Sequence, residues 1–329
     1  MSENFNRLLT KKIINNIPDN KKPVNYLMDI LNIGRESSYR RMRGNIPYTF
    51  EEVAKISQNL SFSIDDIIDG STRSNNSFYG SNHKKSTDFD DVFYANHLNY
   101  YKLLEKISKA KETDIFFSVN NLSSYLVYDF DVLFKFYYYI CMHQYCGISV
   151  NQSFSEIALP DNLVSLRQKI KSASAAISTR TYIFDQHVIK RLVRKLQYYY
   201  GRNLISSDEL EMIKNDAIHF LDHVEKFFQI GANGSGIKHD FYLSLLDVDM
   251  NSLYGVYDNS IVSQYWIYNF YPMIIENKEL ISMHKNWINT LKRSSVLISQ
   301  SNEIVQALHL NLQHENIGKV TNDIFYNYG

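Results

Sequence analysis

The chain has 329 residues, which is more than one typical domain needs and enough for two. Its 35 basic and 35 acidic side chains balance, which argues against a protein that coats nucleic acid over its whole surface, although a local basic stripe stays compatible with a neutral total. Aromatic residues make up 14% of the chain, which excludes a disordered protein because so many rings can build a large core.

The first 70 residues predict five helices, over 5–17, 23–31, 34–43, 49–60 and 63–69. Pro23 suits the first position of the second helix, whose apolar side chains follow at the spacing of one helix face, namely Val24, Leu27, Met28 and Leu31. Thr49 and Glu52 predict a capping box at the start of the fourth helix. The threonine can accept from an N–H three residues on, while the glutamate reaches back.

The third predicted helix concentrates arginine. Residues 35–44 read RESSYRRMRG and hold four arginines, one acid and a closing glycine, which suits a helix stop with positive φ. Arginine can donate two parallel hydrogen bonds to phosphate or to guanine. Ser38 and Met42 share one helix face that can pack inward, which leaves the other side to Arg35, Glu36, Ser37 and Arg40.

These features resemble a lambda-repressor-like helix-turn-helix domain, in the version found in BetR-like regulators. The resemblance covers residues 4–70 and rests on Ile33 before the turn, the YRRMRG ending, the loop with Pro47 and the terminal SIDDIID. Gly34 departs from the usual serine or threonine cap, and Ser38 from a small apolar residue. Both departures should soften the helix slightly, by roughly a few tenths of a kcal/mol for the glycine.

The resemblance implies that helix 34–43 lies in the major groove of DNA. The family's base contacts, at the start and middle of this helix, fall on Arg35, Glu36, Ser37 and Arg40. Candidate phosphate contacts, which fix the register on DNA, are Tyr39, Arg41, Arg43 and Tyr48. The amides at the start of helix 23–31 are a further candidate. A solvated basic helix face in an ordinary helical protein is the alternative.

Residues 71–90 are rich in serine, asparagine and glycine, which predicts a flexible linker rather than a long ordered loop. Residues 91–329 predict an α-rich α+β domain, so that the whole chain is mainly α. Its helices are expected over 91–111, 123–145, 161–179, 183–200, 207–229, 278–296 and 300–317. A small sheet is expected from 241–246, 252–257 and 261–268, and 115–119 could be a strand or a buried turn.

The second domain also resembles the C-terminal half of the same regulators, in SLYGVYDNSIV and LKRSSVLISQSNEIVQALHL. That half is an uncharacterised effector or oligomerisation domain, and the resemblance carries no known ligand.

Several clusters in this domain could carry chemistry, and each has a plainer interpretation. Gly231 to Gly236 looks like a phosphate cradle but lacks the preceding strand, which favours a helix end and a loop. A metal could bind Asp216, His219 and His223 on one helix face, or Cys141, His143 and Cys146, although a surface histidine pair and buried thiols are commoner.

Two further patterns involve basic and aromatic side chains. A second nucleic-acid surface could form from Lys190, Arg191, Arg194 and Lys195, with a solvated helix face as the alternative. The tyrosine triplets at 137–139 and 198–200 could stack on bases or ligand rings, but such spacings are more often core or interface. No G-x-S-x-G or other nucleophile arrangement occurs, so we expect no enzyme, no cofactor and no metal.

The sequence therefore predicts a sequence-specific DNA-binding transcriptional regulator, with double-stranded DNA and a second copy of itself as partners. Two cysteines and no signal-like apolar start favour the cytoplasm and no membrane. The second domain would dimerise, and a small-molecule effector is a further possible partner. The alternatives are a helical protein-interaction module without DNA binding, or a DNA reader fused to a ligand sensor or an enzyme domain.

Overall fold

The computed structural model describes residues 5–17, 21–60, 88–146, 152–177, 179–230, 238–299 and 302–320, together with Phe62, Ile64, Ile67 and the backbone of 78–80. The chain forms two compact units, with their boundary between residues 77 and 78. This boundary falls inside the predicted linker 71–90. Two parts of that stretch are regular elements, because 78–80 form strand β1 and α6 begins at Phe89. Residues 71–77 and 81–87 lie outside the described ranges.

The first unit is helical, as predicted. Its described helices are α1 (Phe5–Asn16), α2 (Pro23–Leu31), α3 (Arg35–Met42) and α4 (Phe50–Leu60). Leu9, Ile13, Leu27 and Ile56 are fully buried where these helices meet, because each lies on the apolar stripe of its own helix. Most of the fifth predicted helix, 63–69, lies outside the described residues, although Ile67 belongs to the same core.

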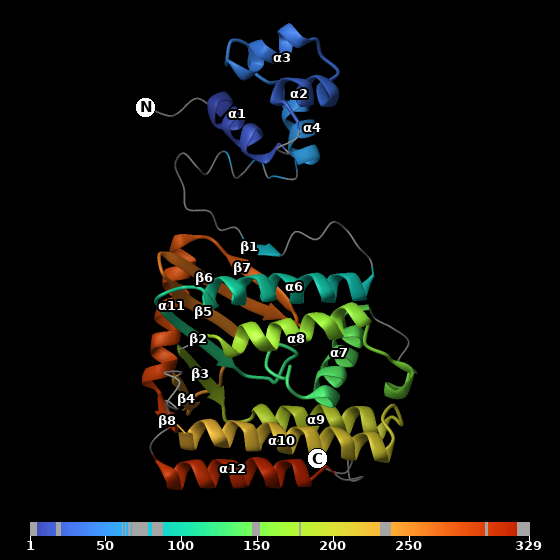
Figure 1. The fold of residues 1–329 in the computed structure, drawn as a ribbon, viewed down its shortest axis with the longest axis vertical. Coiled ribbons are helices and arrows are strands. Elements are labelled where there is room, and N and C mark those ends of the chain that lie inside the picture. The colour runs from blue at the N-terminus through green and yellow to red at the C-terminus, as the bar shows by residue number, and fades with distance from the viewer. Residues whose placement is uncertain are drawn as a thin grey trace, which may run out of the picture. The chain divides into compact units, whose positions relative to one another are not determined.

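The second unit is built on a mixed sheet with the strand order β1-β7-β6-β5-β2-β3-β4-β8 (Figure 1). The strands are β1 (Phe78–Gly80), β2 (Thr113–Val119), β3 (Thr179–Asp185), β4 (Lys238–Ser244), β5 (Ser252–Tyr257), β6 (Ser260–Ile267), β7 (Tyr271–Ile275) and β8 (Ser295–Leu297). β2, β3 and β4 are parallel to one another, and the other pairings are antiparallel. The sheet is thus larger than the small one predicted.

Helices cover both faces of the sheet. They are α6 (Phe89–Ser108), α7 (Asp131–Cys146), α8 (Asp161–Ala175), α9 (Val188–Gly201), α10 (Ser207–Ile230), α11 (Lys278–Arg293) and α12 (Glu303–Gly318), with a short 3-10 turn at Phe154–Glu156. Side chains alternate across the sheet, so Phe117 packs toward α6–α10 while Phe116 and Ile183 pack against α11. None of the described helices is long and apolar enough to cross a membrane.

Four strands, β1, β3, β7 and β8, were not predicted, and the predicted helices 123–145, 161–179 and 183–200 were too long. β3 lies where helix 161–179 was expected to end and helix 183–200 to begin. Both faces of this strand are covered, so its sequence does not alternate regularly between apolar and polar residues. β7 and β8 were assigned to loop and helix. The predicted helix 123–145 starts only at Asp131, because the carboxylate of Asp216 on α10 accepts hydrogen bonds from the N–H groups of Val132 (2.7 Å) and Leu133 (3.1 Å) and caps it there.

Candidate nucleic-acid interface

The turn between α2 and α3 is set by backbone conformation. Asn32 adopts the left-handed conformation (φ 53°) and its N–H bonds to the carbonyl of Met28, which ends α2. Gly34 then begins α3 in extended conformation and, as expected, supplies no side-chain cap. Gly44 has φ +77°, in the region that favours glycine, and closes the helix where the sequence predicted a stop.

The inner face of α3 is fixed against α2. Ser38 is fully buried, and its hydroxyl donates to the carbonyl oxygen of Val24 on α2 at 3.0 Å. Met42 packs against the core of the unit, as predicted. Ser38 stands where the family has a small apolar residue, so it places a hydroxyl in the interior. The hydrogen bond to Val24 satisfies this hydroxyl and links α3 to α2.

The outer face of α3 presents most of the predicted contacts to solvent. Arg35, Glu36, Tyr39, Arg40 and Arg43 are exposed, and at about 100° per residue they share an arc of about 140°. The guanidinium carbons of Arg35 and Arg43 each lie 5.8 Å from the ring centroid of Tyr39. These cation–π contacts hold two cations beside one exposed ring. Ser37 is half-buried at the edge of this face.

Arg41, a predicted phosphate contact, serves the fold instead. Its Nε and Nη2 donate to the two carboxylate oxygens of Glu52 at 3.0 and 2.8 Å, and its side chain is only 13% exposed. Glu52 also completes the predicted capping box, since it accepts from the N–H of Thr49 (2.9 Å) and its own N–H donates to the Thr49 hydroxyl (3.3 Å). Arg41 is thus turned toward α4, because at about 100° per residue it lies about 60° from Ser38, on the edge of the inner face.

The surroundings of Glu52 favour its charged form. Burial alone would raise the pKa of Glu52, but the hydrogen bonds from Arg41 and Thr49 and the positive charges of Arg41 and Lys55 outweigh it and hold the pKa below its ordinary value. The pair therefore locks α3 to the start of α4 at neutral pH.

Tyr48 is the second correction among the predicted phosphate contacts. Its side chain is 7% exposed and belongs to the core of the first unit, and burial raises the pKa of its hydroxyl. The ring therefore does not reach a surface phosphate. Tyr48 follows Pro47 in a polar loop, and no local feature of the sequence signals that the ring is buried.

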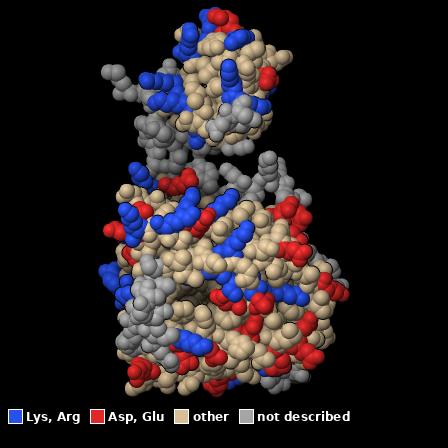
Figure 2. Space-filling model, in the orientation of Figure 1, with Lys and Arg blue, Asp and Glu red and all other residues tan. Residues whose placement is uncertain are grey.

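Lys21 and Lys22 were missed as candidates. Both are exposed directly before the first turn of α2, whose N-cap residue makes no side-chain hydrogen bond to the free N–H groups. A helix N-terminus attracts anions, and two lysines beside it add charge of the same sign. The sequence signal was present, since two lysines precede the proline at the first helical position. Residues 5–60 hold ten Lys and Arg against five Asp and Glu, and basic side chains predominate on the face of this unit in Figure 2.

The second basic stripe does not form a surface. Arg191 forms an ion pair with Asp185 at 2.7 Å and donates to the carbonyl of Asn120, while Nζ of Lys195 lies 5.1 Å from the centroid of the buried Tyr137 ring. Lys190 and Arg194 remain exposed. Arg191 and Lys195 therefore fit neither a second nucleic-acid surface nor the solvated helix face that the sequence favoured.

The two groups weighed as possible metal ligands do not come together. Asp216 caps α7, and Cys141 is buried, with its thiol near the carbonyl of Tyr268. Among the described residues, no group of three or more His, Cys, Asp or Glu side chains could hold a metal ion. Gly231 to Gly236 and the side chain of Cys146 lie outside the described residues. Tyr137, Tyr138 and Tyr139 are core residues, as the plainer interpretation expected.

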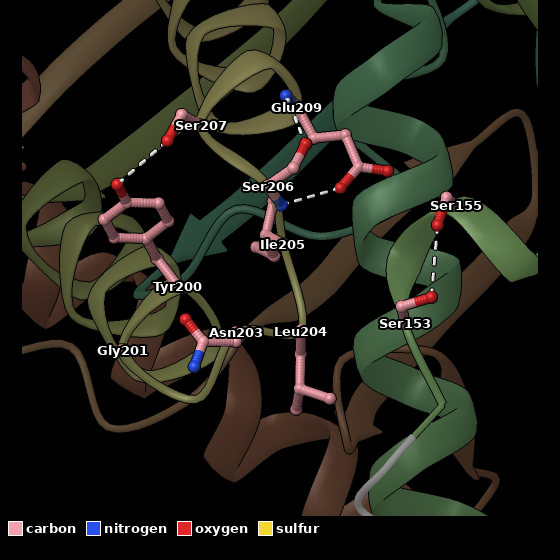
Figure 3. A pocket seen from close by; sticks show the side chains of 10 residues that line it. All are labelled: Ser153, Ser155, Tyr200, Gly201, Asn203, Leu204, Ile205, Ser206, Ser207 and Glu209. Atoms are coloured by element: carbon pink, nitrogen blue, oxygen red, sulfur yellow. Dashed lines mark hydrogen bonds between the residues drawn. The ribbon is translucent and has the colours of Figure 1, made fainter.

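A polar hollow of about 790 Å³ lies beside the turn between α9 and α10 (Figure 3). Its polar groups satisfy one another: Ser206 and Glu209 form a capping box, and the hydroxyls of Tyr200 and Ser207 are 3.1 Å apart. Little hydrogen-bonding capacity is left for a ligand, so this hollow is the capped start of α10 rather than a binding site.

Comparison with known protein families gives a match for the N-terminal part of the chain. Residues 1–98 match the BetR domain family, a segment that covers the first unit and continues into α6. No curated protein and no solved structure matches the chain. The match supports a BetR-like regulator with a DNA-binding type of domain at its N-terminal end. Because it ends at residue 98, the resemblance of residues 91–329 to the C-terminal half of such regulators stays a prediction.

Proposed function

We propose that the protein is a sequence-specific DNA-binding transcriptional regulator that places α3 in the major groove. The observation that carries this proposal is the division of α3 into two faces. Ser38, Arg41 and Met42 fix the helix to α2 and α4, while the exposed face holds three arginines and one acid. A helix that is fixed to its own domain on one face and exposes basic side chains on the other face is arranged like a recognition helix.

Each exposed side chain has a distinct role in this proposal. Arg35 and Arg40 donate pairs of hydrogen bonds to guanine, Glu36 accepts from the amino group of cytosine, and Ser37 accepts or donates at the edge of the face. Arg43 and Tyr39 contact phosphates, as do the first amides of α2 with Lys21 and Lys22 in support. The regulator acts by binding and not by catalysis.

A second copy of the chain completes the regulator. A single domain of this size offers few base contacts, and dimers place two recognition helices one turn of DNA apart. The contact in this proposal is the exposed stripe on α12 formed by Ile304 (77% exposed), Leu308 (66%) and Leu312 (50%), since a two-fold axis lets one apolar stripe cover itself. Leu308→Glu should then give a monomer in light scattering. A dimer of unchanged mass would place the contact elsewhere.

Selection of bound duplexes from a random pool tests the reading of DNA. The full-length protein should enrich a palindrome, and Leu308→Glu should enrich a half-site or bind weakly. Arg40→Ala should cost roughly 1–3 kcal/mol on the preferred site and relax the preference at one base pair. Arg7→Ala removes an equal charge from an exposed position on α1 and is the matched control. An equal loss on all sequences would assign Arg40 to phosphate.

Salt dependence separates this proposal from a protein-interaction module. Binding to DNA should weaken steeply between about 50 and 200 mM salt, because each neutralised phosphate releases counterions. The absence of enrichment at low salt, with folded protein, would refute the reading of DNA and favour a protein partner for the first unit.

A further inference from the structure

The second unit contains a cavity of about 550 Å³ on the face of its sheet that α6, α8 and α10 cover. The parallel strands β2, β3 and β4 form its floor, and α6, α8 and α10 form its walls, on the side of the sheet seen in Figure 1. Ligand pockets in proteins commonly span about 300–1,000 Å³ and combine apolar walls with a few polar groups. This cavity therefore has the size of a small-molecule site.

The polar group in the floor is Arg180. It lies in the middle of the three strands, with Ile115 of β2 and His239 of β4 as its register partners, and is 8% exposed. One of its terminal nitrogens donates to the hydroxyls of Ser174 (2.9 Å) and Tyr182 (3.3 Å). Its Nε is buried and has no hydrogen-bond partner, and no carboxylate among the described residues forms an ion pair with it.

The guanidinium of Arg180 has one edge, Nε and a terminal nitrogen, that is free to bind an anion. A guanidinium holds a carboxylate through two parallel N–H groups, and with one terminal nitrogen already used, Nε and the other terminal nitrogen form such an edge. A buried charge without a partner is costly, and proteins retain one mainly where something must bind it. Tyr128, which also lines the cavity, has a buried hydroxyl without a partner.

Among the described residues that line the cavity, Arg180 is the one cation without an anionic partner. Burial, with a smaller contribution from the charge of Arg180, lowers the pKa of His239 to about 4, so His239 is neutral at physiological pH. Burial also lowers the pKa of His223. Lys171 is at the mouth and pairs with Asp129 at 3.0 Å. One free positive charge matches a monoanion better than a dianion.

Flat aromatic surfaces surround the guanidinium. The ring of Tyr182 stacks on Phe117 (centroids 5.1 Å apart, planes at 14°) and on Phe241 (5.0 Å, 15°) across the three strands. The ring of Phe227 from α10 lies over the same floor, 6.1 Å from Phe241 and 4.8 Å from His239. Such a floor favours a planar apolar ligand, because rings gain contact by offset stacking.

We propose that this cavity binds a carboxylic acid with a one- or two-ring apolar body, whose carboxylate is held by Arg180 and whose ring lies on the aromatic floor. The proposal does not rest on the reading of DNA, because binding is measured without DNA. In combination with that function, the cavity is the effector site of the regulator.

Calorimetric titration of the full-length protein tests the proposal. The probes are benzoate, 2-naphthoate and indole-3-acetate, each compared with its uncharged primary amide. At least one acid should bind roughly 10- to 100-fold more tightly than its amide, which is the usual effect of hydrogen bonds to a charged group. Arg180→Gln should reduce that acid's affinity to the level of the amide, and the thermal midpoint of the variant without ligand should not fall, since a costly buried charge is removed.

Lys171→Gln is the matched control, because it removes a cation that already has a partner at the mouth of the same cavity. Its affinity for the acid should stay within about threefold of the parent. Equal binding of every acid and its amide, or no binding of any acid below about 1 mM, would overturn the proposal. Tighter binding of 2-naphthyl phosphate than of 2-naphthoate would overturn the monoanion assignment. If Arg180→Gln does not fold, the difference between acid and amide on the parent protein still decides.

Discussion

Replacing Arg41 with alanine should loosen the first unit while leaving the exposed face of α3 intact. The side chain makes two charge-assisted hydrogen bonds to Glu52, with 13% and 15% of the two side chains exposed. An exposed ion pair contributes only about 0–1 kcal/mol, but hydrogen bonds to a charged partner away from solvent contribute about 1.5–3 kcal/mol. Part of this gain is offset by the desolvation of both charges. We expect a net loss of about 2–3 kcal/mol.

Amide hydrogen exchange of the full-length protein measures this loss within the first unit alone. Amides of α3 and α4 should exchange roughly 30- to 150-fold faster in Arg41→Ala, the rate equivalent of that free energy. Arg40→Ala removes the same charge one residue earlier, from an exposed position, and should change the rates by less than about threefold. Similar rates in the two variants would refute the assignment of Arg41 to the fold and return it to the contacts with DNA.

Three predictions concern the second unit. Burial lowers the pKa of His97 to about 3 and that of His284 to about 4, so between pH 6.5 and 4 the unfolded chain binds more protons than the folded one. The free energy of unfolding in urea should therefore fall, as the pH is lowered, by up to about 1.4 kcal/mol per pH unit for each histidine. A urea midpoint that does not move from pH 7.5 to 5 would contradict this. Gly255→Ala places a Cβ 2.4 Å from Cδ1 of Ile115 and should cost about 1–3 kcal/mol in urea unfolding, and Ile115→Val, which removes that atom, should restore part of it; a double variant no better than the single one would exclude this clash. Asp216→Ala removes the cap of α7 and should lower the free energy of unfolding by about 1–2 kcal/mol, whereas Asp216→Asn keeps a hydrogen-bond acceptor and should lower it less. Equal melting temperatures for the two variants would show that the charge of Asp216 matters and not the cap.

Local signals in the sequence were sufficient for the first unit. Pro23 and the apolar spacing after it place α2 at its observed bounds, and the Thr49 and Glu52 pair forms as predicted. The burial of Arg41 could have been predicted from the same helical period, because the residue lies beside Ser38 on the edge of the inner face. The burial of Tyr48 could not, since the loop sequence does not show that α1 covers it.

The elements of the second unit that were predicted wrongly are determined by contacts between residues far apart in the sequence. The start of α7 is fixed by Asp216 from a distant helix, and β3 was read as helix because a strand covered on both faces loses its alternating pattern. One feature of the sequence indicates Arg180: it is a charged residue at the two-residue spacing that puts Tyr182 and Phe184 on the same face of a strand. This feature is informative only once the strand itself has been recognised. The cavity assembles from residues between 100 and 241, so no local motif announces it.

The strand order also determines when each unit can fold on the ribosome. The core of the first unit is complete within residues 5–67, whereas the central strand β2 needs β5, with Ser118 beside Ser252 and Thr113 beside Tyr257. At about 5–20 residues per second, translation of the intervening stretch of about 190 residues takes roughly 10–40 s. During that interval a nascent chain carries a folded first unit, including α3, together with a sheet whose β2 edge is still unpaired. Exposure of an unpaired strand edge during synthesis is therefore expected for the second unit and not for the first.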